Sequence, residues 1–145
     1  MNSLKLLKAT SQTLASTHPD LTLLVLFGSR ARGEEDPTSD WDFAFLSDPD
    51  YLVERKPFWF PGSDLVHTLS KLLHISDDKI DLVNLNNCSE ILAHFVARDG
   101  QVIYEKTDGE FAQFQQRALK SKTELREFRR SKREQVLQAL QRWGI

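Results

Sequence analysis

The sequence predicts an α/β protein: a small mixed sheet flanked by helices, followed by a long C-terminal helix. Short apolar or alternating runs indicate strands, and the stretches between them have apolar residues at helical spacing. The charged stretch from Gly109 to Trp143 has no helix breaker and predicts one long helix or two with a bend. We expect the helices to cover one side of the sheet, with an acidic face open at a cleft.

Helical spacing and start signals predict three helices before this stretch. Four strands are expected between and beside them. Residues 28–39 form a turn-rich loop with one helical turn after Gly28, and prolines make residues 47–62 irregular. The expected helices are 3–17, 63–73 and 89–100, and the expected strands are 21–27, 40–46, 79–85 and 102–104.

The first two strands differ in their patterns. Residues 21–27 are almost wholly apolar, which is typical of a strand buried on both faces. In the second strand, Trp41, Phe43 and Phe45 alternate with Asp40 and Asp42. Because side chains alternate across a strand, one face is apolar and the other holds both acids.

Composition and charge limit the class of protein. The chain has 145 residues, 40% apolar and 28% charged, which fits one globular domain. The single cysteine, Cys88, excludes an internal disulfide, and the longest apolar run is far too short to span a membrane. We therefore expect a cytoplasmic protein. The net charge is −8 over residues 1–114 and +6 over 115–145. The basic tail could meet nucleic acid, an acidic partner or the acidic body itself, or it could be simply a solvated helix.

Residues 26–46, LFGSRARGEEDPTSDWDFAFL, hold the main chemical signal. Gly28 lets the backbone approach a ligand, and Ser29 adds a hydroxyl where N–H groups can bind a phosphate. Ten residues later, Asp40 and Asp42 project from one face of a strand, about 7 Å apart. Two carboxylates beside a phosphate site are what Mg²⁺ binding requires. A solvated edge strand is the simpler alternative for the acid pair.

A third acid would complete a two-metal site. Asp81 is our choice because it lies between Ile80 and Leu82 in an expected strand, whereas Asp77 and Asp78 lie in a turn. Its role would be general base or metal ligand. Arg30 could contact a bound phosphate group with its fork of N–H donors, although an arginine in a polar loop is as often simply solvated.

These residues resemble the nucleotidyltransferase superfamily related to DNA polymerase beta, whose signature is Gly-Ser, ten residues, then Asp-x-Asp. The GSRARG and SDWD forms are most similar to the minimal (MNT) antitoxins that accompany HEPN ribonuclease toxins. The resemblance covers residues 20 to about 105. It implies a polymerase-beta-like fold, with a minimal nucleotidyltransferase domain at 1–110 and a basic helical extension at 111–145.

The resemblance also implies a function. ATP would be the donor, Mg²⁺ the cofactor, and Asp40, Asp42 and Asp81 the metal ligands, with AMP passed to a tyrosine of a cognate HEPN toxin in a hetero-oligomeric complex. Gly28, Ser29 and Arg30 would bind the nucleotide. No membrane or direct nucleic-acid binding is expected. Two alternatives remain: a small-molecule nucleotidyltransferase of the aminoglycoside-modifying kind, and an antitoxin that acts by binding alone. The 47–62 insert and the basic tail match no motif of the family.

Overall fold

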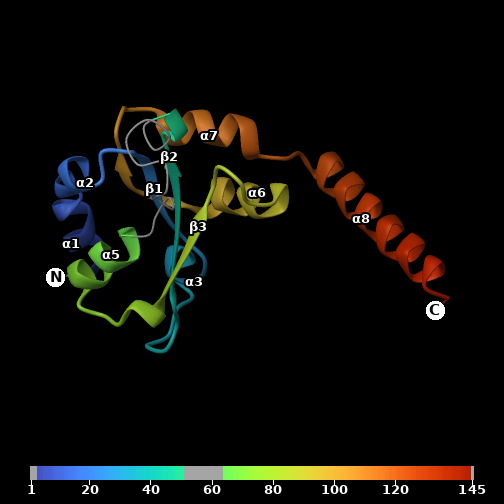
Figure 1. The fold of residues 1–145 in the computed structure, drawn as a ribbon, viewed down its shortest axis with the longest axis horizontal. Helices are drawn as coiled ribbons and strands as arrows, with labels where there is room; N and C mark the ends of the chain where they lie inside the picture. The colour runs from blue at the N-terminus through green and yellow to red at the C-terminus, as the bar shows by residue number, and fades with distance from the viewer. Residues whose placement is uncertain (1–2, 51–63, 145) are drawn as a thin grey trace.

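The structure, a computed structural model, describes residues 3–50 and 64–144. It contains a four-stranded mixed sheet in the order β3-β2-β1-β4. Figure 1 shows β1, β2 and β3 between the flanking helices. β1 is antiparallel to β2 and β4, and β2 is parallel to β3. The predicted fold class is therefore confirmed. The strands are β1 (Leu21–Phe27), β2 (Trp41–Ser47), β3 (Ile80–Asn84) and β4 (Gln101–Glu105).

Helices pack on both faces of the sheet. One core cluster joins Phe43 and Phe45 to the first helices and α5, and the other joins Ala44 to α6 and α7. The expectation that helices cover one side alone is wrong, because helical spacing shows which side of a helix is apolar but not which sheet face it covers. The helices are α1 (Ser3–Thr10), α2 (Gln12–Thr17), α5 (Leu65–Leu73), α6 (Glu90–Asp99) and α7 (Glu110–Ala118).

β1 lies in the middle of this arrangement. Its Leu24 and Leu26 belong to one cluster and its Leu23 and Val25 to the other, and each is at most 1% exposed. The prediction of a strand buried on both faces is confirmed. Because such a strand is held by packing on either side, the residues that directly follow it have a well-defined position.

The expected first helix, 3–17, is divided in two at Ser11. The Ser11 hydroxyl donates a hydrogen bond to the Lys8 carbonyl at 2.7 Å, and Ser11 is buried. A serine hydroxyl that bonds a carbonyl one turn back competes with the helical hydrogen-bond ladder. The expected helix at 63–73 is found as α5 from Leu65, while residues 51–63, which include most of the 47–62 insert, lie outside the described part.

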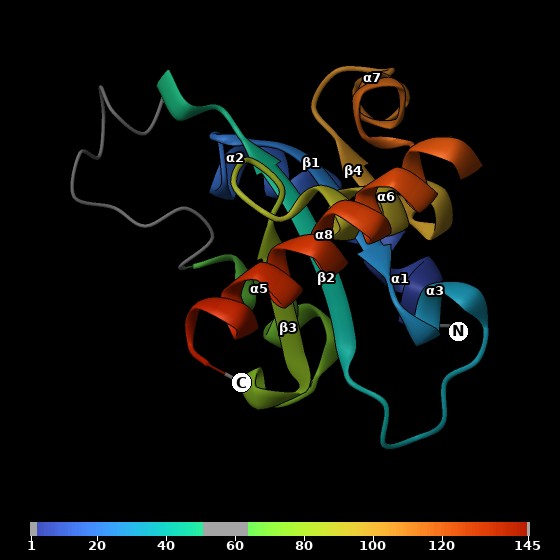
Figure 2. The same ribbon diagram turned by 90° about the vertical axis from the view of Figure 1, so that its right-hand side faces the viewer.

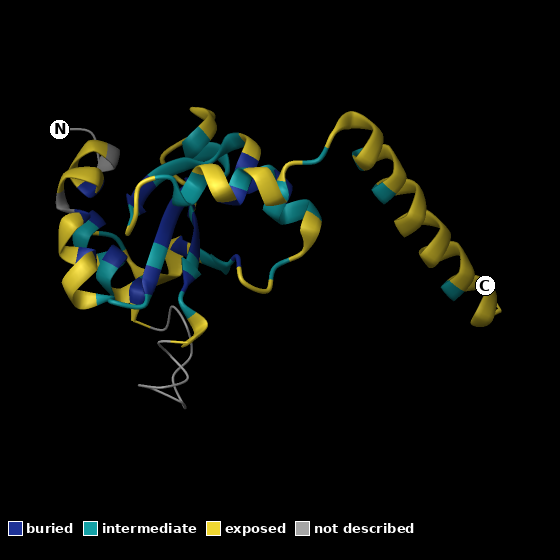
Figure 3. Ribbon diagram, turned by 90° about the horizontal axis from the view of Figure 1, so that it is seen from above, coloured by how far each residue is buried: buried dark blue, intermediate teal, exposed yellow. Residues whose placement is uncertain are grey.

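Of the two predicted possibilities for the C-terminal stretch, the structure has two helices, α7 and α8 (Lys122–Arg142). Ser121 caps α8 in a reciprocal capping box with Glu124, which explains why a new helix starts there. α7 packs on the sheet through Phe114. α8 projects from the body (Figure 1) and has no buried residue along its described length (Figure 3).

The connection between α7 and α8 is attached to α6. The backbone N–H of Lys120 donates to Nδ1 of His94 at 3.0 Å, and the Lys120 ammonium pairs with Glu90 at 3.3 Å. His94 is 4% exposed, so this histidine has a structural role. Within residues 3–50 and 64–144, no helix is long and apolar enough to cross a membrane.

Candidate active site

The Gly-Ser turn lies directly against one of the predicted acids. β1 ends at Phe27, Gly28 follows with φ 75° and ψ −158°, and the short helix α3 (Ser29–Arg32) begins. A Cβ built on Gly28 would collide with Oδ2 of Asp42. Glycine is therefore required here both by backbone conformation and by space. The turn and the acidic strand thus form one surface.

The strand register sets Asp42 and Asp81 opposite each other. β2 and β3 pair in parallel, with Asp42 beside Asp81 and Trp41 beside Ile80, and Figure 2 shows the two strands side by side. Asp42 is half-buried and Asp81 is exposed. Burial is the main cause that raises the pKa of Asp42, and the charges of Asp81 and Asp40 and a hydrogen bond to Asp81 raise it further.

Asp40 lies just before β2, which begins at Trp41 and not at Asp40 as expected. Its carboxylate is near enough to raise the pKa of Asp42, although Asp40 itself is exposed. The apolar back face of this strand is as predicted, since Trp41, Phe43 and Phe45 are buried. The strand is therefore held by its back face while its acids point to the other side.

The donor chemistry of the site fits Mg²⁺. The carboxylates of Asp42 and Asp81 lie side by side next to the Gly28 turn, where any side chain at Gly28 would collide with Asp42. A bound cation would relieve the repulsion between the two carboxylates. No cluster of three His, Cys, Asp or Glu side chains stands ready for a metal among the described residues. The preformed element is thus the Asp42–Asp81 pair, and Asp40 adds charge from one side.

Arg30 contacts the loop that leads to the acids. Its Nε and Nη2 donate to the Ser39 carbonyl at 3.2 and 2.8 Å, and its guanidinium lies 4.3 Å from the centroid of the Trp41 ring. These contacts close the loop between α3 and β2 and so position Asp40. The predicted contact of Arg30 with a triphosphate stays a prediction.

Gln101 is a supporting residue that sequence reasoning missed. From β4, its side-chain amide donates to the Ala31 carbonyl at 2.6 Å and so ties α3 to the sheet. The two residues are 70 positions apart, so no local pattern marks the contact. The Arg30 contact had a signal, because Trp41 offers an aromatic face to a nearby arginine.

A mixed sheet with a glycine-serine turn packed against strand-borne aspartates fits the fold and site expected of a nucleotidyltransferase. The chain belongs to the polymerase beta nucleotidyltransferase family, whose model matches residues 10–109. It is 45% identical over 145 aligned residues to "Protein adenylyltransferase MntA" of Aphanizomenon flos-aquae (strain 2012/KM1/D3). That comparison covers 96% of this chain and 93% of the relative.

Solved structures share the fold. A crystal structure described as a toxin-antitoxin with AMP-PNP matches with a TM-score of 0.58 at 22% identity, covering 97% of this chain and 99% of the other. A tri-AMPylated Shewanella oneidensis HEPN toxin in complex with MNT antitoxin matches with a TM-score of 0.55 at 20% identity, covering 95% and 98%. At these identities the likeness shows the fold alone.

Proposed function

We propose that this protein is an antitoxin that transfers AMP from ATP, with Mg²⁺, to a tyrosine of a cognate HEPN ribonuclease toxin and so neutralises it. The observation that supports transfer is the contact of Gly28 with Asp42 beside Asp81. That the acceptor is a protein is inferred from the 45% identity to a protein adenylyltransferase over nearly the full length of both chains. That it is a tyrosine of a HEPN toxin is inferred from the resemblance to the MNT antitoxins.

The residues divide the work between donor and acceptor. Gly28 and Ser29 hold the triphosphate at the turn, where backbone N–H groups favour negative charge. Asp40, Asp42 and Asp81 would hold the metal. When bound, Mg²⁺ neutralises phosphate charge and makes a nearby hydroxyl more acidic.

Asp81 faces solvent beside the half-buried Asp42, so it is the acid that an incoming acceptor meets. The acceptor oxygen forms a bond to the α-phosphorus, the bond from that phosphorus to pyrophosphate breaks, and pyrophosphate leaves with the electron pair. Asp81 receives the proton of the hydroxyl. Catalysis comes mainly from positioning and charge, since the protein forms no covalent bond.

The experiment follows label from α-labelled ATP into the co-expressed toxin. Asp40→Asn with Asp42→Asn should abolish labelling, because it removes the charges that bind the metal while the fold stays intact. A chelator should also abolish labelling, because it removes the metal itself. Asp48→Asn with Asp50→Asn is the matched control, since this pair has the same spacing beyond the opposite end of β2.

The outcomes separate the three functions. Labelling that persists in the Asp40/Asp42 double variant would contradict the catalytic site. A toxin that is neutralised by the double variant as well as by wild type would indicate an antitoxin that acts by binding alone. Label found in small molecules and not in the toxin would indicate a small-molecule nucleotidyltransferase.

A further inference from the structure

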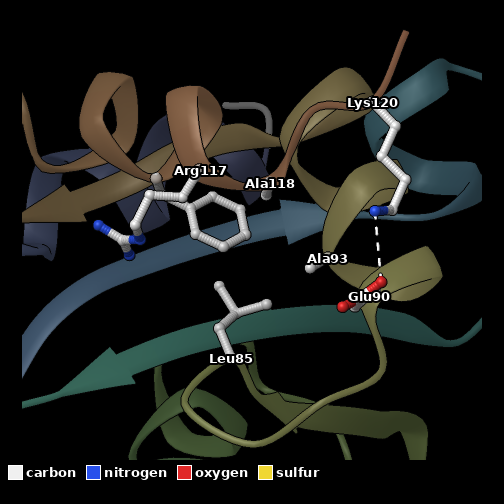
Figure 4. Close-up of a pocket in the computed structure, with 7 residues that line it drawn as sticks. Leu85, Glu90, Ala93, Arg117, Ala118 and Lys120 are labelled. Carbon is white, nitrogen blue, oxygen red and sulfur yellow. Dashed lines mark ion pairs between the residues drawn. The ribbon is translucent and has the colours of Figure 1, made fainter. Parts of the chain in front are cut away.

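A pocket lies where α6, α7 and the residue after β3 meet (Figure 4). Its volume is about 230 Å³. Leu85 and Ala118 face each other across it, and the Lys120–Glu90 pair lies on the opposite side from Arg117 (Figure 4). Ala93 and Phe114 complete its apolar walls. The active site described above uses none of these residues.

The pocket lies on the sheet face that also carries the acid pair. The core cluster around Phe114 includes Ala44 of β2, Val83 of β3 and Leu85. Asp42 stands two positions before Ala44, and Asp81 stands two positions before Val83. Side chains two apart in a strand point to the same face. Leu85 continues the ladder, since its N–H donates to the Phe45 carbonyl at 2.9 Å. From Asp81 to Leu85 is four residues, or about 13 Å along the strand.

Size and charge describe what would enter the pocket. A cavity of about 150 Å³ accepts a benzene-sized group, so this pocket has room for one large apolar side chain. At the rim, Lys120 is paired with Glu90, whereas no ion pair within 3–50 and 64–144 involves Arg117. The Arg117 guanidinium, which lies 5.9 Å from the centroid of the Phe114 ring, brings a positive charge to the rim. Together with the basic α8 that follows, this charge favours an acidic neighbour.

We propose that this pocket anchors the acceptor protein and so selects the residue that is modified. An extended acceptor segment places one apolar side chain between Leu85 and Ala118 and an acidic side chain on Arg117. Extended chain spans about 3.3 Å per residue, so the attacked hydroxyl lies about four residues from the anchor. The inference rests on the proposed transfer to a protein.

The nucleotide is a less suitable occupant. In the proposed reaction the triphosphate binds at Gly28, beside the start of β2, whereas the pocket lies beyond the end of β3. The anionic part of the nucleotide is therefore far from the positive charge of Arg117 at the pocket rim. An adenine base offers no anionic group to Arg117, while a protein segment does. Direct measurement of nucleotide affinity separates the two.

The test uses two variants of the full chain. Ala118→Phe fills the pocket, with Ala112→Phe on the exposed side of α7 as its control. Arg117→Glu reverses the rim charge, with Lys71→Glu on the exposed surface of α5, across the sheet, as its control. Arg117 is exposed, so this second variant keeps the test valid if Ala118→Phe does not fold.

Both test variants should raise the KM for the toxin at least tenfold, with kcat within about twofold of wild type, because they remove uniform binding of the acceptor. Affinity for AMP-PNP should not change, and the controls should match wild type. Unchanged KM in both test variants, or weaker AMP-PNP binding, would overturn the pocket's role while leaving the proposed transfer in place. A wild-type protein that never labels the toxin would overturn the proposed function itself.

Discussion

Gly28→Ala tests whether the turn and the acid pair form one surface. Gly33→Ala is its matched partner, because Gly33 also has a positive φ of 73° and closes the same short helix, α3. A Cβ on Gly33 would meet nothing within 4 Å, whereas one on Gly28 would reach Asp42 Cγ at 3.0 Å and collide with Oδ2. The two variants therefore share a left-handed φ and differ in the collision.

The magnitudes follow from these two terms. A left-handed φ costs an ordinary residue about 1 kcal/mol, which is the whole expected loss for Gly33→Ala. Gly28 also has ψ of −158°, a combination that is essentially restricted to glycine, and the overpacking adds to it, giving about 3 kcal/mol in total. For a chain of this size the Tm should fall by about 6–12 °C for Gly28→Ala and about 2–4 °C for Gly33→Ala.

Calorimetry and single-turnover labelling check both parts. Gly28→Ala should reduce AMP transfer more than 10²-fold, since a shift of about 1 Å in a reacting group has that effect. Gly33→Ala should stay within about twofold. In an Asp42→Ala background, Gly28→Ala should lose about 1–2 kcal/mol of its effect on stability. Equal Tm and equal transfer in the two glycine variants would refute the reasoning.

Three further results are expected. In the presence of a chelator, Asp42→Asn should raise the Tm at pH 7 but not below pH 4. Burial first, and then the charges of Asp81 and Asp40, raise the pKa of Asp42 in the native state. Ionisation of Asp42 therefore destabilises the native state as the pH rises through this raised pKa, and asparagine removes that loss. A Tm unchanged at pH 7 would contradict this. Asp81→Asn leaves Asp40 and Asp42 to hold the metal, so it should spare most of the Mg-ATP affinity measured by calorimetry but reduce transfer about 10²-fold; normal transfer would exclude its role as base. Weaker, less salt-dependent toxin binding is expected, by titration at low and high salt, after charge reversal of Arg129, Arg130 and Arg133.

The parts of the fold that local patterns determine could be predicted from the sequence. In a strand, residues two positions apart lie on the same face, so a short stretch of sequence shows which faces are apolar. The apolar run of β1 therefore predicted burial of both its faces, and the alternation in β2 predicted burial of Trp41 and Phe43. The Gly-Ser turn before the acids was predictable for the same reason, because glycine has a distinct conformational range.

The remaining features depend on contacts between distant residues. The pairing of Asp42 with Asp81 follows from a parallel register that a connecting segment of more than thirty residues does not specify. The side of the sheet that α6 and α7 cover could not be known either, because both sheet faces offer apolar residues. At Ser11 the helix divides through a hydrogen bond that a serine makes only in some contexts.

The link between α7 and α8 gives α8 the properties of a lever. Its 21 residues make a rod of about 32 Å, so a rotation of about 10° at residues 119–121 moves the far end by about 6 Å. Lys120 holds the base of that rod: its N–H bonds the buried ring of His94, and its ammonium pairs with Glu90 and lies 5.7 Å from the centroid of the Phe128 ring of α8. The position of Trp143, which is 80% exposed near the tip, therefore depends on these three contacts at the base of the helix.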